Sequence, residues 1–118
     1  MASLNMGQSF DFTVENVDGQ ITKKSAGNYA LGYVKTKGSF IVEYIGRADE
    51  DINSEIKEHI GEHKEYQRFK YSYALSSLEA FEKECRNYHD FGENKKLHNN
   101  THPACPEGAD WKCPVCEK

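Results

Sequence analysis

The chain has 118 residues, of which 37% are hydrophobic and 29% are charged, with a formal net charge of −4. These values are typical of one small globular domain, and the acidic balance counts against tight, sequence-independent binding of nucleic acid. No apolar run approaches the length of a membrane span, and residues 1–20 lack the pattern of a secretory signal. We therefore expect a cytoplasmic protein that has no membrane partner.

Residues 1–25 are expected to form an N-terminal extension that carries no chemistry. Apolar and polar side chains alternate over residues 10–14, which predicts a short strand. Residues 17–20 include an Asp-Gly pair and predict a turn. Residues 21–25 are then expected to continue as a strand into the next predicted strand.

A β-hairpin is predicted at the centre of the chain. Residues 27–34 and 40–47 are rich in β-branched and aromatic side chains, and a Thr-Lys-Gly-Ser turn at 36–39 separates them. Each predicted strand carries a tyrosine close to a glycine. These two tripeptides are Gly27-Asn28-Tyr29 and Tyr44-Ile45-Gly46.

A helix, a third strand and a second helix are predicted to follow the hairpin. Ile52, Ile56 and Ile60 repeat every four residues, which indicates one apolar helix face ending near Gly61. Alternation over residues 68–75 indicates a strand with one buried face. The next helix is expected to begin at a capping box, in which Ser76 is the cap and Glu79 follows three residues later, and to end near Phe91. The apolar face of this helix is expected to contain Leu78, Phe81, Cys85 and Tyr88.

The hairpin tripeptides and this order of elements resemble the GIY-YIG nuclease domain, which is named after two such tripeptides on adjacent strands. The resemblance implies an α/β (α+β) domain over residues 26–100, with a small three-stranded sheet flanked by helices. It also implies a metal-dependent endonuclease that hydrolyses nucleic acid, with DNA favoured over RNA as the partner.

The resemblance further implies roles for individual residues. Tyr29 and Tyr44 would frame the phosphate, with Tyr29 as the candidate base. Glu84 would hold one Mg²⁺ or Mn²⁺, and its place at the edge of the apolar helix face suits a carboxylate that binds a hard cation. Asn99 would be the polar residue after this helix, unless Asn100 has that role. The structural alternatives are packing tyrosines, a surface glutamate and a loop asparagine.

One expected residue is missing from the pattern. Where the family carries an arginine on the first helix, this chain has Glu55. Arg47 is the best substitute, although it could instead pair with Asp49 or Asp51. His59 lies four residues after Glu55, so the two could form an ion pair or take part in proton transfer. This departure supports a rival hypothesis, in which a catalytically degenerate scaffold binds nucleic acid or a protein partner.

The last segment, residues 101–118, is predicted to be an irregular tail packed on the domain. Cys113 and Cys116 have the spacing of a zinc knuckle, which lets two thiolates bind one tetrahedral Zn²⁺. His102 and Cys105 are the expected further ligands, with His98 and Cys85 in reserve. The alternative is that these cysteines are small buried apolar residues or free thiols.

Overall fold

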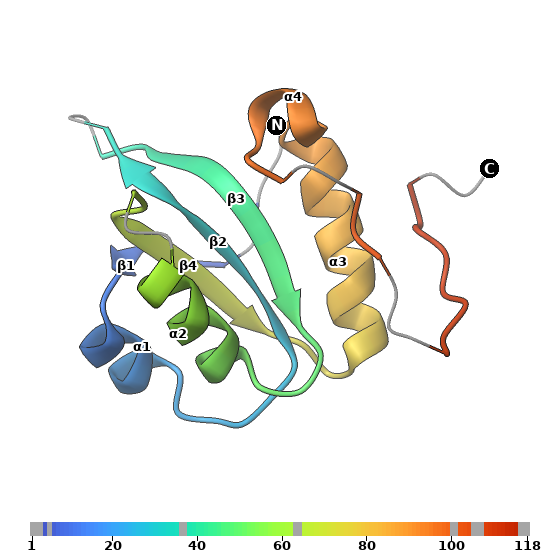
Figure 1. Cartoon of the computed structure of the whole chain (residues 1–118), viewed down its shortest axis with the longest axis horizontal. Coiled ribbons are helices and arrows are strands. Elements are labelled where there is room, and N and C mark those ends of the chain that lie inside the picture. The colour runs from blue at the N-terminus through green and yellow to red at the C-terminus, as the bar shows by residue number, and fades with distance from the viewer. Residues whose placement is uncertain are drawn as a thin grey trace.

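The computed structural model describes residues 4, 6–35, 38–62, 65–99, 102–104 and 108–115. The described residues form an α+β fold, in which one antiparallel sheet is covered by helices (Figure 1). The elements in chain order are β1 (Phe10–Asp11), α1 (Val14–Gln20), β2 (Gly27–Val34), β3 (Phe40–Ala48), α2 (Ile52–Glu62), β4 (Arg68–Tyr73), α3 (Ser77–Asp90) and α4 (Glu93–Lys96).

The predicted hairpin is confirmed and forms half of the sheet. The strand order is β1-β4-β2-β3, so β2 is paired on both sides and β3 is an outer strand. Tyr29 is the cross-strand partner of Gly46, and the register shifts between Leu31 and Gly32. The two tripeptides therefore meet where Tyr29 pairs with Gly46, while Gly27 pairs with Ala48 and Tyr44 pairs with Leu31.

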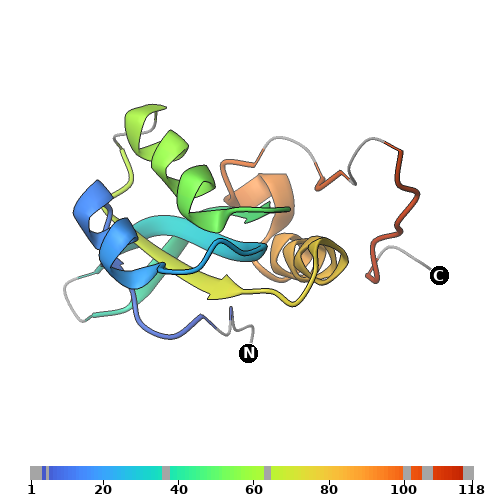
Figure 2. The ribbon, with the colours of Figure 1, turned by 90° about the horizontal axis from the view of Figure 1, so that it is seen from below.

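Each face of the sheet buries its own apolar cluster. Helices α1 and α2 lie together on one face (Figure 2), where Val17, Ile52 and Ile56 pack against Leu31 and Phe69. On the other face, α3 packs mainly against β2 and β3. The cluster there contains Ala30, Ile45, Tyr88 and Leu97, together with Leu4 and Met6 from the N-terminal segment.

The N-terminal segment differs from the prediction. Residues 14–20 form a helix rather than the end of a strand and a turn, because the Thr13 side chain caps the chain by accepting a hydrogen bond from the Asn16 amide. Residues 21–25 are irregular and are not a strand. The two-residue strand β1 pairs with β4, so the sheet has four strands and not three.

Two later predictions are confirmed and one is too long. Helix α2 begins at Ile52, and α3 begins after Ser76, whose side chain accepts a hydrogen bond from the Glu79 amide at 3.2 Å. Strand β4, however, ends at Tyr73, and Leu75 is 91% exposed rather than buried. Among the described helices, none has an apolar stretch that could cross a membrane.

Candidate functional site

Gly46 is needed because the Tyr29 ring lies across it. A Cβ built at position 46 would overlap the end of that ring, and Tyr29 itself is only 1% exposed. At the other tripeptide, a Cβ on Gly27 would meet the Ser72 carbonyl oxygen and the Ile52 side chain. The two glycines therefore make room for packing within the domain.

The Tyr29 hydroxyl points toward helix α2, where it meets two titratable side chains. It lies 2.7 Å from His59 Nε2 and 3.4 Å from a carboxylate oxygen of Glu55. Glu55 and His59 are one helical turn apart, and His59 Nε2 lies 3.8 Å from a Glu55 carboxylate oxygen. The structure thus confirms the contact between Glu55 and His59, and it adds a hydrogen bond between His59 and Tyr29 that sequence reasoning missed.

Tyr44 completes this aromatic group from strand β3. Its ring is stacked with that of Tyr29 at a centroid distance of 6.4 Å, and it lies 5.2 Å from the His59 ring. Burial first, and the Glu55 carboxylate second, raise the pKa of Tyr29 well above its ordinary value. A phenol in this environment stays protonated at neutral pH, so it is poorly suited to act alone as a base.

Arg47 and Glu84 form a shielded ion pair between β3 and α3. Arg47 Nη1 donates to Glu84 Oε1 at 2.7 Å, and both side chains are 11% exposed. Arg47 Nε also donates to Asp49 at 2.9 Å, and Nη2 donates to the Ala104 carbonyl oxygen. Burial raises the pKa of Glu84, while its hydrogen bond with Arg47 lowers it. The predicted pairing of Arg47 with Asp49 is present together with the pair to Glu84.

The ion pair and the tyrosine pair are electrostatic neighbours. Burial is the main reason why the pKa of Tyr29 and that of Tyr44 are raised, and the Glu84 carboxylate adds to the effect on both. Burial also raises the pKa of Glu55, and the positive charge of Arg47 opposes that change. Tyr29 and Tyr44 nevertheless pack with α2, which carries Glu55, whereas Arg47 and Glu84 lie between β3 and α3 on the other face of the sheet.

Asn99 follows α3 and α4, and its side chain binds the backbone of strand β3. Its Oδ1 accepts from the Ile45 amide at 3.0 Å, and its Nδ2 donates to the Ile45 carbonyl oxygen at 2.7 Å. The neighbouring His98 amide donates to the Glu43 carbonyl oxygen at 2.6 Å. Asn99 is 8% exposed and holds the outer strand in position, whereas Asn100 lies outside the described residues.

A second group of chemistry-bearing side chains lies between α3 and the tail. Cys85, His102 and Cys113 place one ligand atom each within 4.8 Å of one another, so the group could hold a metal ion. Cys85 was only a reserve ligand in the sequence-based prediction. The expected ligands Cys105 and Cys116 lie outside the described residues.

His98, the other reserve ligand, is bound elsewhere: its Nδ1 lies 2.8 Å from the Tyr66 hydroxyl, and its Nε2 lies 3.8 Å from a Glu43 carboxylate oxygen. It is therefore engaged with residues outside the cysteine group. Of the two reserve ligands, the fold therefore brings only Cys85 to the described part of the tail. The apolar pattern of α3 had indicated Cys85 mainly as a core residue.

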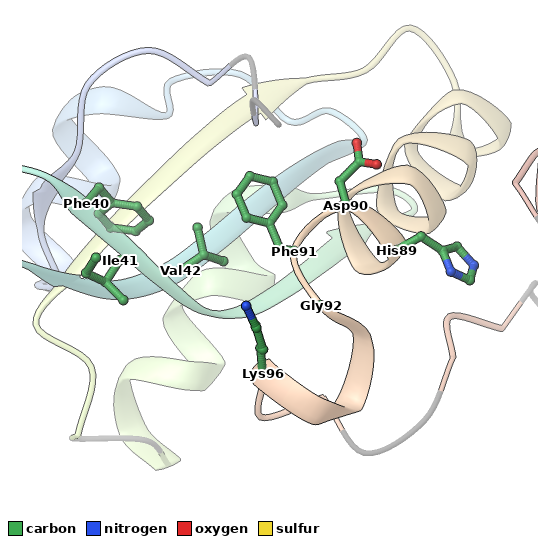
Figure 3. Close-up of a pocket in the computed structure, with 8 residues that line it drawn as sticks. All are labelled: Phe40, Ile41, Val42, His89, Asp90, Phe91, Gly92 and Lys96. Carbon is green, nitrogen blue, oxygen red and sulfur yellow. The ribbon is translucent and has the colours of Figure 1, made fainter. Parts of the chain in front are cut away.

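A pocket of about 510 Å³ lies at the other end of strand β3 (Figure 3). Its lining comes from the start of β3, the end of α3 and α4 and contains none of the predicted site residues; it consists of Phe40, Ile41, Val42, His89, Asp90, Phe91, Gly92 and Lys96. The region that holds Arg47 and Glu84 is thus separate from this pocket.

Comparisons with protein-family models, with curated proteins and with solved structures gave no significant match. The evidence for function is therefore the geometry of the described residues.

Proposed function

We propose that this chain is a metal-dependent endonuclease of the GIY-YIG type, which hydrolyses phosphodiester bonds in DNA more readily than in RNA. The observation that carries the proposal is the Arg47–Glu84 ion pair, whose arginine directly follows Gly46 of the second tripeptide. Phosphodiester hydrolysis needs a cation beside the phosphate and stabilisation of charge on the leaving oxygen. A carboxylate and a guanidinium held together are suited to these two tasks.

Glu84 is the residue proposed to hold Mg²⁺ or Mn²⁺. Its Oε1 accepts the Arg47 hydrogen bond, and its second oxygen can bind a hard cation. Mg²⁺ commonly keeps several waters and uses only one or two protein carboxylates, so a single glutamate is a suitable ligand set. When bound there, the ion would polarise the phosphate and activate a water.

Arg47 is the proposed phosphate-binding residue in place of the missing helix arginine. Its guanidinium is held by Glu84 and by Asp49, and the Asp49 side chain is 37% exposed. A phosphate oxygen can replace the exposed Asp49 carboxylate, while Glu84 keeps its hydrogen bond to Arg47. Arginine matches phosphate through paired N–H donors, which favours this exchange.

Tyr44 and His59 are proposed to take the contact and proton-transfer roles. Tyr44 is less buried than Tyr29, so its hydroxyl is the better placed to meet a phosphate oxygen. His59 is the better proton acceptor, because its imidazole ring offers a nitrogen acceptor, whereas burial raises the pKa of Tyr29 and keeps that phenol protonated. Tyr29 would then be a positioning residue that fixes the His59 ring through the 2.7 Å hydrogen bond.

The Cys85, His102 and Cys113 group is proposed to hold Zn²⁺ rather than Mg²⁺ or Mn²⁺. Thiolate and imidazole are the ligands that zinc prefers, whereas magnesium and manganese favour oxygen. We assign this ion a structural role and no part in the hydrolysis.

The nuclease proposal is tested by incubating the protein with labelled branched, single-stranded and duplex DNA, with Mg²⁺, with Mn²⁺ or with a chelator. We expect metal-dependent cleavage by the wild type, loss of cleavage in Glu84→Gln, and retention in Glu82→Gln, a matched change two residues away on α3. Cleavage that persists in Glu84→Gln would remove this residue from the mechanism. Absence of cleavage by the wild type on all substrates would contradict the proposal.

A specific observation favours the rival function as well. Glu55 stands where the family places a cation, and the described structure gives Arg47 three hydrogen-bond partners, namely Asp49, Glu84 and Ala104. A scaffold of this kind could bind nucleic acid or a protein without cleaving anything. Retention of DNA in a gel-shift assay, with no cleavage in either metal, would support this interaction module.

A further inference from the structure

His89 lies beside the Cys85, His102 and Cys113 group, although the sequence did not mark it as a ligand. It is one helical turn after Cys85 on α3, so both side chains project from the same face of the helix. Its Nε2 lies 3.2 Å from His102 Nε2, and it is also a hydrogen-bond partner of Cys113. In Figure 3 the His89 ring points away from β3 and from Phe91.

The spacing of the two imidazole nitrogens fits a tetrahedral zinc ion. With zinc–nitrogen bonds of about 2.0–2.1 Å, two nitrogen ligands of one tetrahedron are separated by roughly 3.3–3.4 Å. The separation between His89 Nε2 and His102 Nε2 is 3.2 Å. Cys85 and Cys113 supply two sulfur atoms, which lie within 4.8 Å of each other and of the His102 ligand nitrogen.

Both imidazole rings are oriented as they are in zinc sites. His89 Nδ1 lies 2.6 Å from a Glu93 carboxylate oxygen, and His102 Nδ1 lies 2.7 Å from the Pro103 carbonyl oxygen. Metal-binding histidines usually donate their second N–H to such a group, which fixes the ring and leaves the other nitrogen for the metal. In both residues Nε2 is the nitrogen that faces the other imidazole ring.

An apolar shell surrounds the sulfur side of the group. Cys85 and Cys113 are buried in one cluster with Phe81, against which Trp111 and Val115 pack. The Phe81 and Trp111 ring centroids are 5.8 Å apart. Exclusion of water in this way favours metal–thiolate bonds and limits exchange of the ion.

We propose that His89 joins Cys85, His102 and Cys113 as the fourth ligand of one zinc ion, and that this ion attaches residues 102–104 and 108–115 to α3. The proposal rests on the zinc assignment made above and is independent of the nuclease activity. Residues 102–104 and 108–115 contain no described helix or strand, so a metal ion gives this tail a fixed attachment that secondary structure does not provide.

The ion also connects the tail to the candidate nuclease site. Cys85 directly follows Glu84 on α3, and Ala104 is two residues after His102. The Ala104 carbonyl oxygen accepts a hydrogen bond from Arg47. A zinc ion that holds Cys85 and His102 therefore keeps the Ala104 carbonyl against the Arg47 guanidinium and steadies the Arg47–Glu84 pair.

The test measures zinc content and affinity in the full chain, without reference to activity. We expect one zinc per wild-type chain by elemental analysis, and at least a hundredfold weaker affinity in His89→Gln, because a direct ligand is lost. Glu93→Gln should weaken zinc binding by about 10–100-fold, which is typical of a residue behind a ligand. His98→Gln is the matched control and should bind zinc as the wild type does.

Cobalt substitution of the wild type gives a second readout that needs no variant. The charge-transfer absorption of Co²⁺ grows with the number of thiolate ligands, and we expect an intensity that corresponds to two. The assignment of His89 would be overturned if the absorption corresponded to three thiolates, if Cys116→Ser lost zinc and if His89→Gln kept normal affinity. Those results together would show that Cys116 is the fourth ligand. A wild type that binds neither zinc nor cobalt would overturn the zinc assignment itself.

The tethering role is tested by hydrogen exchange and limited proteolysis. When zinc is removed with a chelator, residues 102–104 and 108–115 should exchange and be cleaved faster, while the sheet keeps its protection. Equal protection of this segment with and without zinc would contradict the tether. None of these outcomes depends on whether the protein cleaves DNA.

Discussion

Gly46 and Tyr29 are cross-strand partners, and the Tyr29 ring occupies the space that a side chain at position 46 would need. We predict that Gly46→Ala lowers the free energy of unfolding by about 1–3 kcal/mol, because a methyl group there overpacks the site. Urea denaturation measures the change. Gly61→Ala in α2 is the control: nothing lies within 4 Å of a Cβ there, so we expect it to stabilise the protein by about 0.5–1 kcal/mol. Equal effects of the two changes would contradict this explanation of Gly46.

The hydrogen bond between Tyr29 and His59 should be measurable as a coupling energy. In a double-mutant cycle of Tyr29→Phe and His59→Gln, we expect the two effects on unfolding to be non-additive by about 0.5–1.5 kcal/mol. Pairing Tyr33→Phe with His59→Gln is the control cycle and should be additive. Additivity in the first cycle would mean that the 2.7 Å contact contributes nothing to stability.

Asn99 should stabilise the outer strand rather than the chemistry. Asn99→Ala removes both hydrogen bonds to the Ile45 backbone, so the N–H and C=O of Ile45 lose these partners. We expect a loss of about 1–3 kcal/mol and faster hydrogen exchange of the Ile45 amide, followed by NMR. Asn94→Ala, a change at an exposed position in α4, should leave that amide protected. Unchanged protection of Ile45 in Asn99→Ala would refute this role.

Glu55 should make stability depend on pH in a defined direction. Burial first, and the neighbouring Glu58 second, raise the pKa of Glu55 above its ordinary value of 4.5. The folded protein therefore keeps a proton that the unfolded chain releases, so this residue lowers stability as pH rises from that value through the raised pKa. Glu55→Gln removes this effect. The free energy of unfolding of the variant, relative to the wild type, should therefore increase as pH rises from 4.5 to the raised pKa and stay constant above it. Urea unfolding of both proteins at several pH values from about 4 to about 6 measures the difference. A difference that is constant or shrinks with rising pH would contradict the prediction.

The sequence predicted the central part of the fold well because its local signals are strong. The hairpin has β-branched strands around a glycine-containing turn, α2 has isoleucines at a helical period, and α3 begins at a serine cap. Helix α1 was missed because it is seven residues long, contains Gly19 and buries only Val17. The alternation at residues 10–14 predicted a strand of that length. The pairing with β4 shows that the strand contains only residues 10 and 11.

The candidate sites were only partly predictable, since long-range contacts assemble them. Arg47 and Glu84 are 37 residues apart in sequence, and only the packing of α3 beside β3 makes them an ion pair. His89 carried no signal as a ligand, because the sequence shows neither its Glu93 partner in space nor its approach to His102. The spacing of Cys113 and Cys116 did point to a metal, but the helix cysteine that joins Cys113 was predicted mainly as a core residue.

The most direct test of the central claim is the binding of Mn²⁺ measured by electron paramagnetic resonance, in the presence of DNA that cannot be cleaved. The zinc group is first loaded with zinc, so that it does not take up manganese. We predict one bound Mn²⁺ per chain in the wild type and in Glu82→Gln, and none in Glu84→Gln. Equal binding by Glu84→Gln and the wild type, or no binding by the wild type, would contradict a metal-dependent nuclease built on Glu84.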